Sequence, residues 1–189
     1  MERQTQQPSP QPSAPLDILI LAAGLGTRMR SSTAKVLHKL GGRPLIAHVC
    51  RTASALVKGE RPVYVVVGHQ AEEVEEAVRA ELGEGGAVFV TQTEQRGTGD
   101  AVFAARAALG QANSTLLVLS GDVPLVRAET LGSLVHQHRT HRGRGAACTL
   151  MAVRLEDPTG YGRVIRDAEG RFDRIVEQKD ATPEERQVS

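Results

Sequence analysis

Residues 16–35 decide the fold of this chain, and they read L-D-I-L-I-L-A-A-G-L-G-T-R-M-R-S-S-T-A-K. The first six residues form an apolar run broken only by Asp17, which is typical of a strand buried on both faces. The run then opens into small residues, glycines and cations. In a sheet of parallel strands, ligands bind beyond the carboxyl ends of the strands, so this loop lies where a ligand would be held.

The segments that follow alternate between strand and helix patterns. Apolar runs rich in β-branched residues occupy 61–68, 87–90 and 114–120. Apolar residues at helical spacing follow Pro44, cover 71–82, follow Gly97 and cover 130–138. This alternation predicts an α/β fold with a mostly parallel sheet and helices on both faces.

Beyond residue 145 the pattern changes to the period of two that is typical of hairpin strands. It covers residues 146–153, 162–167 and 171–177. We therefore expect a mixed or antiparallel β-hairpin extension of the sheet.

Composition excludes several classes of protein. The 189 residues carry 23 basic and 22 acidic side chains, so no net field favours nucleic acid or an anionic membrane as a partner. Two Tyr, three Phe and no Trp are too few for a platform that stacks bases. No apolar run approaches the ~20 residues that span a bilayer. We expect a soluble, cytoplasmic protein.

The two ends of the chain differ from its middle. Residues 1–15 are rich in Gln and Pro and are predicted to be a disordered tail without the apolar segment of a secretory signal. Residues 16–189 are predicted to form one domain. Its hydrophilic ending, P-E-E-R-Q-V-S, has no capping signal and indicates a domain that is incomplete at its C-terminus. Cys50 and Cys148 are read as two buried thiols, with a disulfide as the alternative.

The loop after the first strand has the composition of a phosphate-binding loop. Its small residues let the backbone approach an anion, and Arg28 and Lys35 add full positive charges. The alternative is a plain glycine turn with surface cations. A dinucleotide-binding fingerprint needs glycine where Met29 stands, and the G-K-[ST] of a P-loop is absent. A phosphate-binding role for this loop therefore requires a motif other than the dinucleotide-binding fingerprint and the P-loop.

Two further motifs follow predicted strands. G-D-V-P-L places Asp122 at the ligand-binding edge of the sheet, where one carboxylate suits Mg²⁺, although an Asp-containing turn stopped by Pro124 has the same pattern. Q-T-E-Q-R-G-T-G-D offers the Gln92 amide to a uracil edge. In the alternative, Thr98 simply caps a helix and Asp100 interacts with its dipole, and both interpretations can hold together.

Six motifs in order resemble those of the bacterial N-acetylglucosamine-1-phosphate uridyltransferases. They are L-A-A-G-L-G-T-R-M, K-V-L-H, Q-T-E-Q-R-G-T-G, G-D-V-P-L, D-P-T-G-Y-G-R and I-V-E-Q-K-D-A-T, and they run from about Asp17 to the last residues. The resemblance implies a Rossmann-like nucleotidyltransferase fold, with residues 16–189 as the pyrophosphorylase domain. It implies that Arg28 and Lys35 are catalytic and that Asp122 binds Mg²⁺. It implies substrate contacts at Leu21, Ala22, Ala23, Gly24, Lys35, Gln92, Gly97, Thr98, Ser120, Gly121, Asp122, Gly162 and Glu177.

The implied reaction is uridyl transfer from UTP to N-acetylglucosamine 1-phosphate. It releases pyrophosphate and yields UDP-N-acetylglucosamine, a precursor for peptidoglycan and lipopolysaccharide. Another nucleoside triphosphate, another sugar or alcohol phosphate, or nucleotide binding without turnover are the alternatives. Nucleic acid and membrane are not expected partners.

The chain departs from the family pattern at three positions: Asp100 stands where histidine is common, Ser120 where tyrosine is common and Ala34 where proline is common. Two asparagines that the family uses for sugar and metal, and its acetyltransferase repeat domain, lie beyond the present C-terminus. We therefore expect no acetyl transfer and weak or absent uridyl transfer by the isolated chain. The resemblance implies homotrimers for a full-length protein, organised by that repeat domain, and we do not extend this state to the present chain.

Overall fold

The computed structural model describes residues 14–188, except 25, 27, 28, 30, 95, 111–113 and 144. The chain divides into two compact units, Met1–Arg144 and Gly145–Ser189, called here the N-terminal and C-terminal units. Of the predicted tail 1–15, only Ala14 and Pro15 lie within the described residues. Both are tied to the fold, because Arg139 Nη2 donates to the Ala14 carbonyl and the Thr115 N–H donates to the Pro15 carbonyl.

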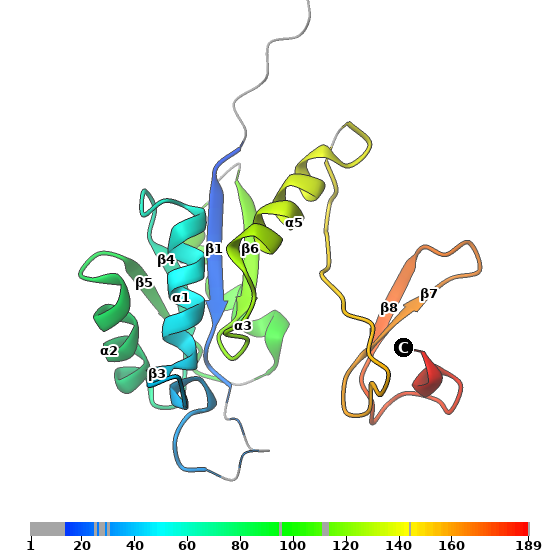
Figure 1. Ribbon diagram of the computed structural model, residues 1–189, viewed down its shortest axis with the longest axis horizontal. Coiled ribbons are helices and arrows are strands. Elements are labelled where there is room, and N and C mark those ends of the chain that lie inside the picture. The colour runs from blue at the N-terminus through cyan, green and yellow to red at the C-terminus, as the bar shows by residue number, and fades with distance from the viewer. Residues whose placement is uncertain are drawn as a thin grey trace, which may run out of the picture. The chain divides into compact units, whose positions relative to one another are not determined.

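Four parallel strands form the sheet of the N-terminal unit. These are β1 (Leu16–Leu21), β4 (Val63–Val67), β5 (Ala87–Thr91) and β6 (Thr115–Ser120), in the order β5-β4-β1-β6. The chain moves outward from β1 to β4 and β5, then crosses back to lay β6 on the other side of β1 (Figure 1). The strand order therefore reverses between β1 and β6. A crevice for ligands forms beyond the carboxyl ends of strands at such a switch point.

Helices cover both faces of this sheet, as predicted. One face packs against α1 (Leu45–Leu56), α2 (Ala71–Leu82) and α5 (Ala128–Thr140). The other face packs against α3 (Thr98–Ala104) and α4 (Arg106–Leu109). The core of the first face contains Ile18, Ile20, Ile46, Val49, Cys50, Val63, Val65, Val67, Val74, Val78, Leu117, Leu131 and Val135. The predicted α/β fold is confirmed.

Short elements complete the N-terminal unit. The 3-10 helix η2 (Lys35–Leu37) leads into a two-stranded hairpin, β2 (Lys39–Leu40) and β3 (Arg43–Pro44). Gly41 and Gly42, which connect the two strands, both have positive φ, the backbone conformation that two-residue hairpin turns demand. A second 3-10 turn, η3 (His141–Gly143), follows α5.

The C-terminal unit is built on a hairpin of β7 (Arg163–Arg166) and β8 (Phe172–Val176), followed by the 3-10 turn η4 (Glu185–Gln187). This confirms the predicted hairpin strands at 162–167 and 171–177. The strand predicted at 146–153 is wrong, because these residues take no regular structure. Their apolar side chains Leu150, Met151 and Val153 are at least half exposed, so the segment has neither a pairing strand nor a buried face to stabilise it.

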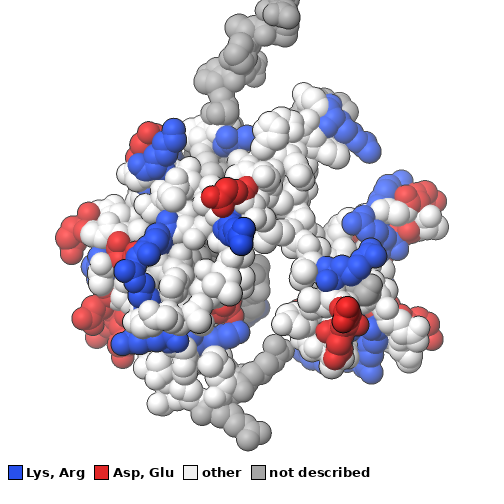
Figure 2. All heavy atoms as spheres, viewed as in Figure 1, with Lys and Arg blue, Asp and Glu red and all other residues white. Residues whose placement is uncertain are grey.

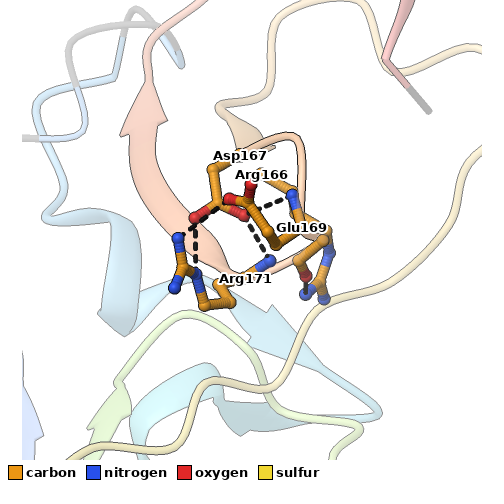
Figure 3. Close-up of polar contacts among 5 residues, drawn as sticks. Arg166, Asp167, Glu169 and Arg171 are labelled. Atoms are coloured by element: carbon orange, nitrogen blue, oxygen red, sulfur yellow. Dashed lines mark hydrogen bonds and ion pairs between the residues drawn. The ribbon is translucent and has the colours of Figure 1, made fainter.

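Asp167 organises the turn between β7 and β8 (Figure 3). Its carboxylate accepts hydrogen bonds from the N–H groups of Glu169 and Arg171 and from Arg171 Nε, at 2.7–3.1 Å. Arg166 Nη1 donates to the Gly170 carbonyl. The hydrogen bond from the Arg171 side chain is the main reason that the pKa of Asp167 lies below its usual value.

Charge is interspersed over the surface. In the view of Figure 2, acidic and basic side chains alternate over each unit without an extended region of one sign. None of the described helices is both long enough and apolar enough to cross a bilayer. Both cysteines are free, and Cys148 is exposed, so the expectation of two buried thiols is correct only for Cys50. Cys148 lies in the irregular segment 146–153.

Candidate functional site

A cavity of about 500 Å³ opens at the carboxyl edge of the parallel sheet, at the switch point between β1 and β6. Its walls come from the ends of three strands and from the segments that follow them. The described residues that line it are Leu21, Ala22, Ala23, Gly24, Gly26, Met29, Lys35, Val36, Gln92, Gly97, Thr98, Ala101, Ser120 and Asp122. The sequence predicted ten of these fourteen, which the structure brings together in one place.

The end of β1 forms the first wall. The Ala22 N–H donates to the Val66 carbonyl at 2.8 Å and extends the sheet by one residue, so it is not available to a phosphate. Any backbone donors that this loop offers an anion must lie beyond Ala22. At Gly24 an added Cβ would meet no atom within 4 Å, so the loop faces open space there.

Gly26 brings the loop against the segment that carries Lys35. It has φ +61°, and a Cβ at this position would lie 2.8 Å from Lys35 Cβ. Glycine is therefore needed both for the left-handed backbone and for the close approach. Arg28, the second catalytic residue expected from the sequence, lies outside the described residues.

Lys35 and Asp122 form an ion pair in the wall of the cavity. Lys35 Nζ lies 2.6 Å from Asp122 Oδ2, and the two side chains are 43% and 28% exposed. Both predicted residues are therefore accessible to a ligand, and each holds the other in place. This pairing was not predicted, because nothing in the two separate motifs K-V-L-H and G-D-V-P-L indicates their distance.

Gly121 sets the position of Asp122. Its N–H donates to the Leu21 carbonyl at 3.0 Å, which pins the end of β6 to the end of β1. A Cβ at Gly121 would lie 2.9 Å from Ile46 Cδ1, so a larger residue would force the turn away from the core. The tight packing explains why glycine precedes the aspartate, and Gly121 contributes geometry rather than lining the cavity.

Gln92 forms the far wall, directly after β5. It is only 6% exposed, and its N–H donates to the Val67 carbonyl at 2.8 Å. Thr98 is the first residue of α3, whose N-cap is Gly97 with φ +108° and without a side-chain cap bond. The expected cap by Thr98 is therefore wrong, since the helix begins one residue earlier than that role requires.

Gly162 and Glu177 belong to the C-terminal unit, where they lie together. A Cβ at Gly162 would be 3.7 Å from Glu177 Oε1. Arg163, next to Gly162, donates from Nη2 to the side chain of Gln178 at 2.9 Å, next to Glu177. The two positions expected to face the sugar are thus held side by side by a neighbouring arginine.

Sequence reasoning missed Gly26, Met29, Val36 and Ala101 as lining residues. Gly26 belongs to the G-x-G pattern and could have been predicted. The apolar residues Met29, Val36 and Ala101 belong to no pattern that indicates a cavity wall. Gln70 was also missed. It has φ +54°, and its side-chain carbonyl accepts the N–H of Ala34, which ties the start of α2 to the segment before Lys35.

The described lining of the cavity offers few ligands to a metal. The described residues contain no group of three or more His, Cys, Asp or Glu side chains that could hold an ion. Among the described residues that line the cavity, Asp122 is the one with a carboxylate, and it is partly exposed. Mg²⁺ binds readily through one or two carboxylates when phosphates and waters complete its shell, so the residues present fit a metal that arrives with a nucleotide.

The model of the MobA-like NTP transferase domain matches residues 18–179. The chain belongs to this family. Bifunctional protein GlmU of Anaeromyxobacter sp. strain K is 52% identical over 179 residues, which cover 95% of this chain and 36% of the relative. GlmU of Solibacter usitatus is 50% identical over 90% of this chain and 35% of its own length. The chain thus spans about a third of these relatives, and the resemblance drawn from the six motifs is confirmed.

Solved structures share the fold at lower identity. HddC from Yersinia pseudotuberculosis, complexed with GMP-PN, aligns with a TM-score of 0.63 and 22% identity over 86% of this chain and 69% of its own. A UDP-glucose pyrophosphorylase complexed with UDP-glucose aligns with a TM-score of 0.59 and 22% identity, covering 88% of this chain and 71% of its own. These likenesses establish the nucleotidyltransferase fold.

Proposed function

We propose that this chain carries the uridyl-transfer machinery that converts UTP and N-acetylglucosamine 1-phosphate into UDP-N-acetylglucosamine and pyrophosphate. One observation carries the proposal: a cavity at the switch point brings Lys35 of η2 together with Asp122 and Gln92, which follow the ends of two separate strands. The 52% identity to a GlmU protein supports the choice of substrates. By the same similarity to bacterial relatives, we propose that the product feeds cell-wall precursor synthesis in the cytoplasm.

The chemistry requires positioning and charge neutralisation rather than an acid–base pair. A phosphate oxygen of the sugar phosphate forms a bond to the α-phosphorus of UTP, while the bond from that phosphorus to pyrophosphate breaks. The nucleophile already carries its negative charge, so no general base is needed. Lys35 would stabilise the charge on the triphosphate from its exposed position at the cavity wall. We assign the same role to Arg28 from its place in the loop.

Asp122 would hold Mg²⁺, which when bound neutralises the phosphate oxygens and orients them. Lys35 Nζ lies 2.6 Å from Asp122 Oδ2, so a metal held by this carboxylate would compete with Lys35 for the same negative charge. A triphosphate offers the ammonium group a replacement anion. We therefore expect metal and nucleotide to favour each other's binding at this site.

We propose that the C-terminal unit contributes the sugar contacts. Glu177 can accept hydrogen bonds from sugar hydroxyl groups, and the backbone at Gly162 lies beside it. Ser120, Gly97 and Thr98 are proposed to contact the nucleoside, as three residues at the cavity wall. The assignment of residues 16–189 to one pyrophosphorylase domain also remains a proposal.

Thermal melting with ligands tests the base assignment. The whole chain is melted with Mg²⁺ and, separately, UTP, CTP, ATP or GTP. A nucleotide at a hundredfold its Kd should add about 2.7 kcal/mol of stability. We expect the largest shift with UTP, and a larger shift from CTP or GTP would contradict the assignment.

Two variants test whether the thermal shift caused by UTP arises from binding in the cavity. Lys35→Met should remove most of the UTP shift, whereas Lys39→Met, which replaces an exposed lysine of β2 outside the cavity wall, should retain it. Turnover is followed separately by chromatography of UDP-N-acetylglucosamine. A UTP shift of equal size in Lys35→Met would show that the nucleotide binds elsewhere.

A further inference from the structure

Asp100 lies in the first turn of α3, eight residues after the proposed base-binding residue Gln92. It is one of the three positions at which this chain departs from the family pattern. Its carboxylate oxygen Oδ2 accepts a hydrogen bond from Gln92 Nε2 at 2.7 Å. The same Nε2 lies 3.4 Å from the Gly97 carbonyl oxygen, a longer and weaker second contact.

These contacts fix which way the Gln92 amide is turned. A carboxylate and a backbone carbonyl offer only acceptor atoms, so both neighbours require the NH₂ group of the amide. Turning the amide over would place its carbonyl oxygen against two acceptors and leave them without a donor. Gln92 itself is 6% exposed, so in that orientation its own amide would gain little from water.

The fixed amide leaves Gln92 with one kind of atom for a ligand. Its two N–H groups face Asp100 and Gly97, and Gln92 itself lines the cavity. Its carbonyl oxygen Oε1 is therefore what it can present to a bound base. A glutamine without this constraint can present either a donor or an acceptor, and so can accept either kind of base edge.

We propose that Asp100 is a positioning residue that determines base specificity, because it holds Gln92 as a hydrogen-bond acceptor whose Oε1 faces N3 of the bound base and so selects uracil over cytosine. This inference rests on the proposed uridyl transfer. Uracil carries a proton on N3 and donates to an acceptor there, whereas N3 of cytosine is itself an acceptor. Two acceptors that face each other in a buried site cannot form a hydrogen bond, which disfavours CTP.

A purely structural role for Asp100 makes a different prediction. An acidic residue in the first turn of a helix also interacts favourably with the helix dipole. Loss of that interaction would weaken α3 and lower the affinity for every nucleotide to a similar extent. The ratio of the UTP and CTP dissociation constants separates the two roles, because only the orientation of Gln92 changes that ratio.

The experiment measures Kd for UTP and CTP, with Mg²⁺, on the full chain and on four variants. Asp100→Ala frees the amide, and Gln92→Met removes it while keeping an unbranched side chain. The double variant Asp100→Ala/Gln92→Met tests whether Asp100 acts through Gln92. Glu94→Ala is the matched control, since it removes an exposed negative charge that pairs with Arg96 in the same connection.

We expect Asp100→Ala to lower the preference for UTP over CTP about tenfold, mainly through tighter CTP binding. Glu94→Ala should leave the preference unchanged, and Asp100→Ala should have no further effect on it in the Gln92→Met background. An unchanged preference in Asp100→Ala, or an equal loss in the presence and absence of Gln92, would overturn the proposal.

A second measurement needs no nucleotide. The side-chain NH₂ signals of Gln92, assigned by their loss in Gln92→Met, should shift in Asp100→Ala as the hydrogen bond to the carboxylate is lost. Signals that do not shift would show that Asp100 does not hold the amide, whatever the chain binds. Shifted signals in a chain that binds neither UTP nor CTP would instead overturn the proposed function and the selectivity that rests on it.

Discussion

The N-terminal unit buries apolar side chains against both faces of a parallel sheet, whereas the C-terminal unit has a guanidinium group at its centre. Ile20, Val65 and Val66 in the first unit are fully buried. Among the described residues of the second unit, only Arg163 and Ala181 are buried. The first unit therefore depends on the hydrophobic effect, and the second on directional hydrogen bonds.

Arg163 links three parts of the C-terminal unit. It is 3% exposed and donates to the carbonyls of Tyr161 and Arg186 and to the side chain of Gln178. Its partners are neutral acceptors, so the arrangement depends on each contact being made. The difference from the N-terminal unit predicts that the same kind of substitution will have unequal effects in the two units.

The largest effect is expected from a cavity in the first core. Ile20→Ala in β1 should cost about 2–5 kcal/mol, because the central strand is packed on both sides and cannot close around the lost atoms. The matched change Ile175→Ala in β8, where the side chain is 52% exposed, should cost less than about 0.5 kcal/mol. Urea unfolding followed by far-UV circular dichroism measures both, and equal losses would contradict the comparison.

The next effect tests the buried arginine. Arg163→Met keeps an unbranched stem but leaves three acceptors without a donor, at a cost of about 1–3 kcal/mol. Hydrogen exchange should accelerate in β7 and β8 and stay unchanged in β1 and β4. Arg174→Met, which removes an exposed arginine of β8, should have the smaller effect. Faster exchange throughout both units would argue against a local role.

Replacing one glycine by alanine in each unit adds a single Cβ atom and so compares how tightly the two units are packed. Gly121→Ala places Cβ 2.9 Å from Ile46 Cδ1 and 3.1 Å from the Leu21 carbonyl oxygen, and should cost about 1–3 kcal/mol. Gly162→Ala places Cβ 3.2 Å from Ile175 Cγ2, a longer approach to a methyl group of a half-exposed side chain, and should cost less. Thermal melting of the two variants decides the order.

Acid should affect the C-terminal unit through three carboxyl groups. Hydrogen bonds from Thr159 lower the pKa of Asp157, those from Arg171 lower the pKa of Asp167, and the Thr182 N–H lowers the pKa of Glu185. Their contribution to stability is complete above the ordinary values of 3.8 for Asp and 4.5 for Glu, and is lost as the pH falls through the lower folded-state values.

Nuclear magnetic resonance spectra recorded as the pH falls from 6 to 2.5 measure this loss. We expect the amide signals of β7 and β8 to lose dispersion as those three carboxylates are protonated. In Asp167→Asn the change with pH should be smaller, because one of the titrating groups is absent. Retention of full dispersion in β7 and β8 at pH 2.5 would show that these hydrogen bonds contribute little.

The smallest change is chemical and leaves the fold intact. Each unit carries one cysteine, and burial, together with the charge of Glu81, raises the pKa of Cys50 to about 12. Cys148 is exposed. Iodoacetamide at pH 8 should therefore add one group to the native chain, at Cys148, and two groups to the urea-unfolded chain. Mass spectrometry of tryptic peptides reads the result, and early modification of Cys50 would contradict its burial.

The sequence predicted best where local periodicity and burial agree. The bounds of β1 and α2 match the predicted segments, because the first is continuously apolar and the second alternates apolar and acidic residues at helical spacing. The prediction of a strand at 146–153 is wrong for the opposite reason. Their alternation is a strand pattern, but a strand needs a partner, and no pattern within eight residues shows whether one is present.

In the candidate site, too, some features could be predicted from the sequence and others could not. Asp122 and Gln92 could be predicted because each follows a strand that ends at the ligand-binding edge. Their interactions could not, since the ion pair of Asp122 with Lys35 and the bond from Gln92 to Asp100 depend on how separate segments pack. Gln70 illustrates the limit, because its bond to Ala34 spans 36 positions and neither residue lies in one of the six motifs.

The described residues that line the cavity end at Asp122, and the last helix that packs on the sheet ends at Thr140. A ribosome therefore finishes the whole described wall of this cavity before it makes either strand of the hairpin that follows. Since domains fold as units during synthesis, starting with the N-terminal one, a ligand of the cavity can stabilise the nascent chain while its C-terminal strands are still being translated.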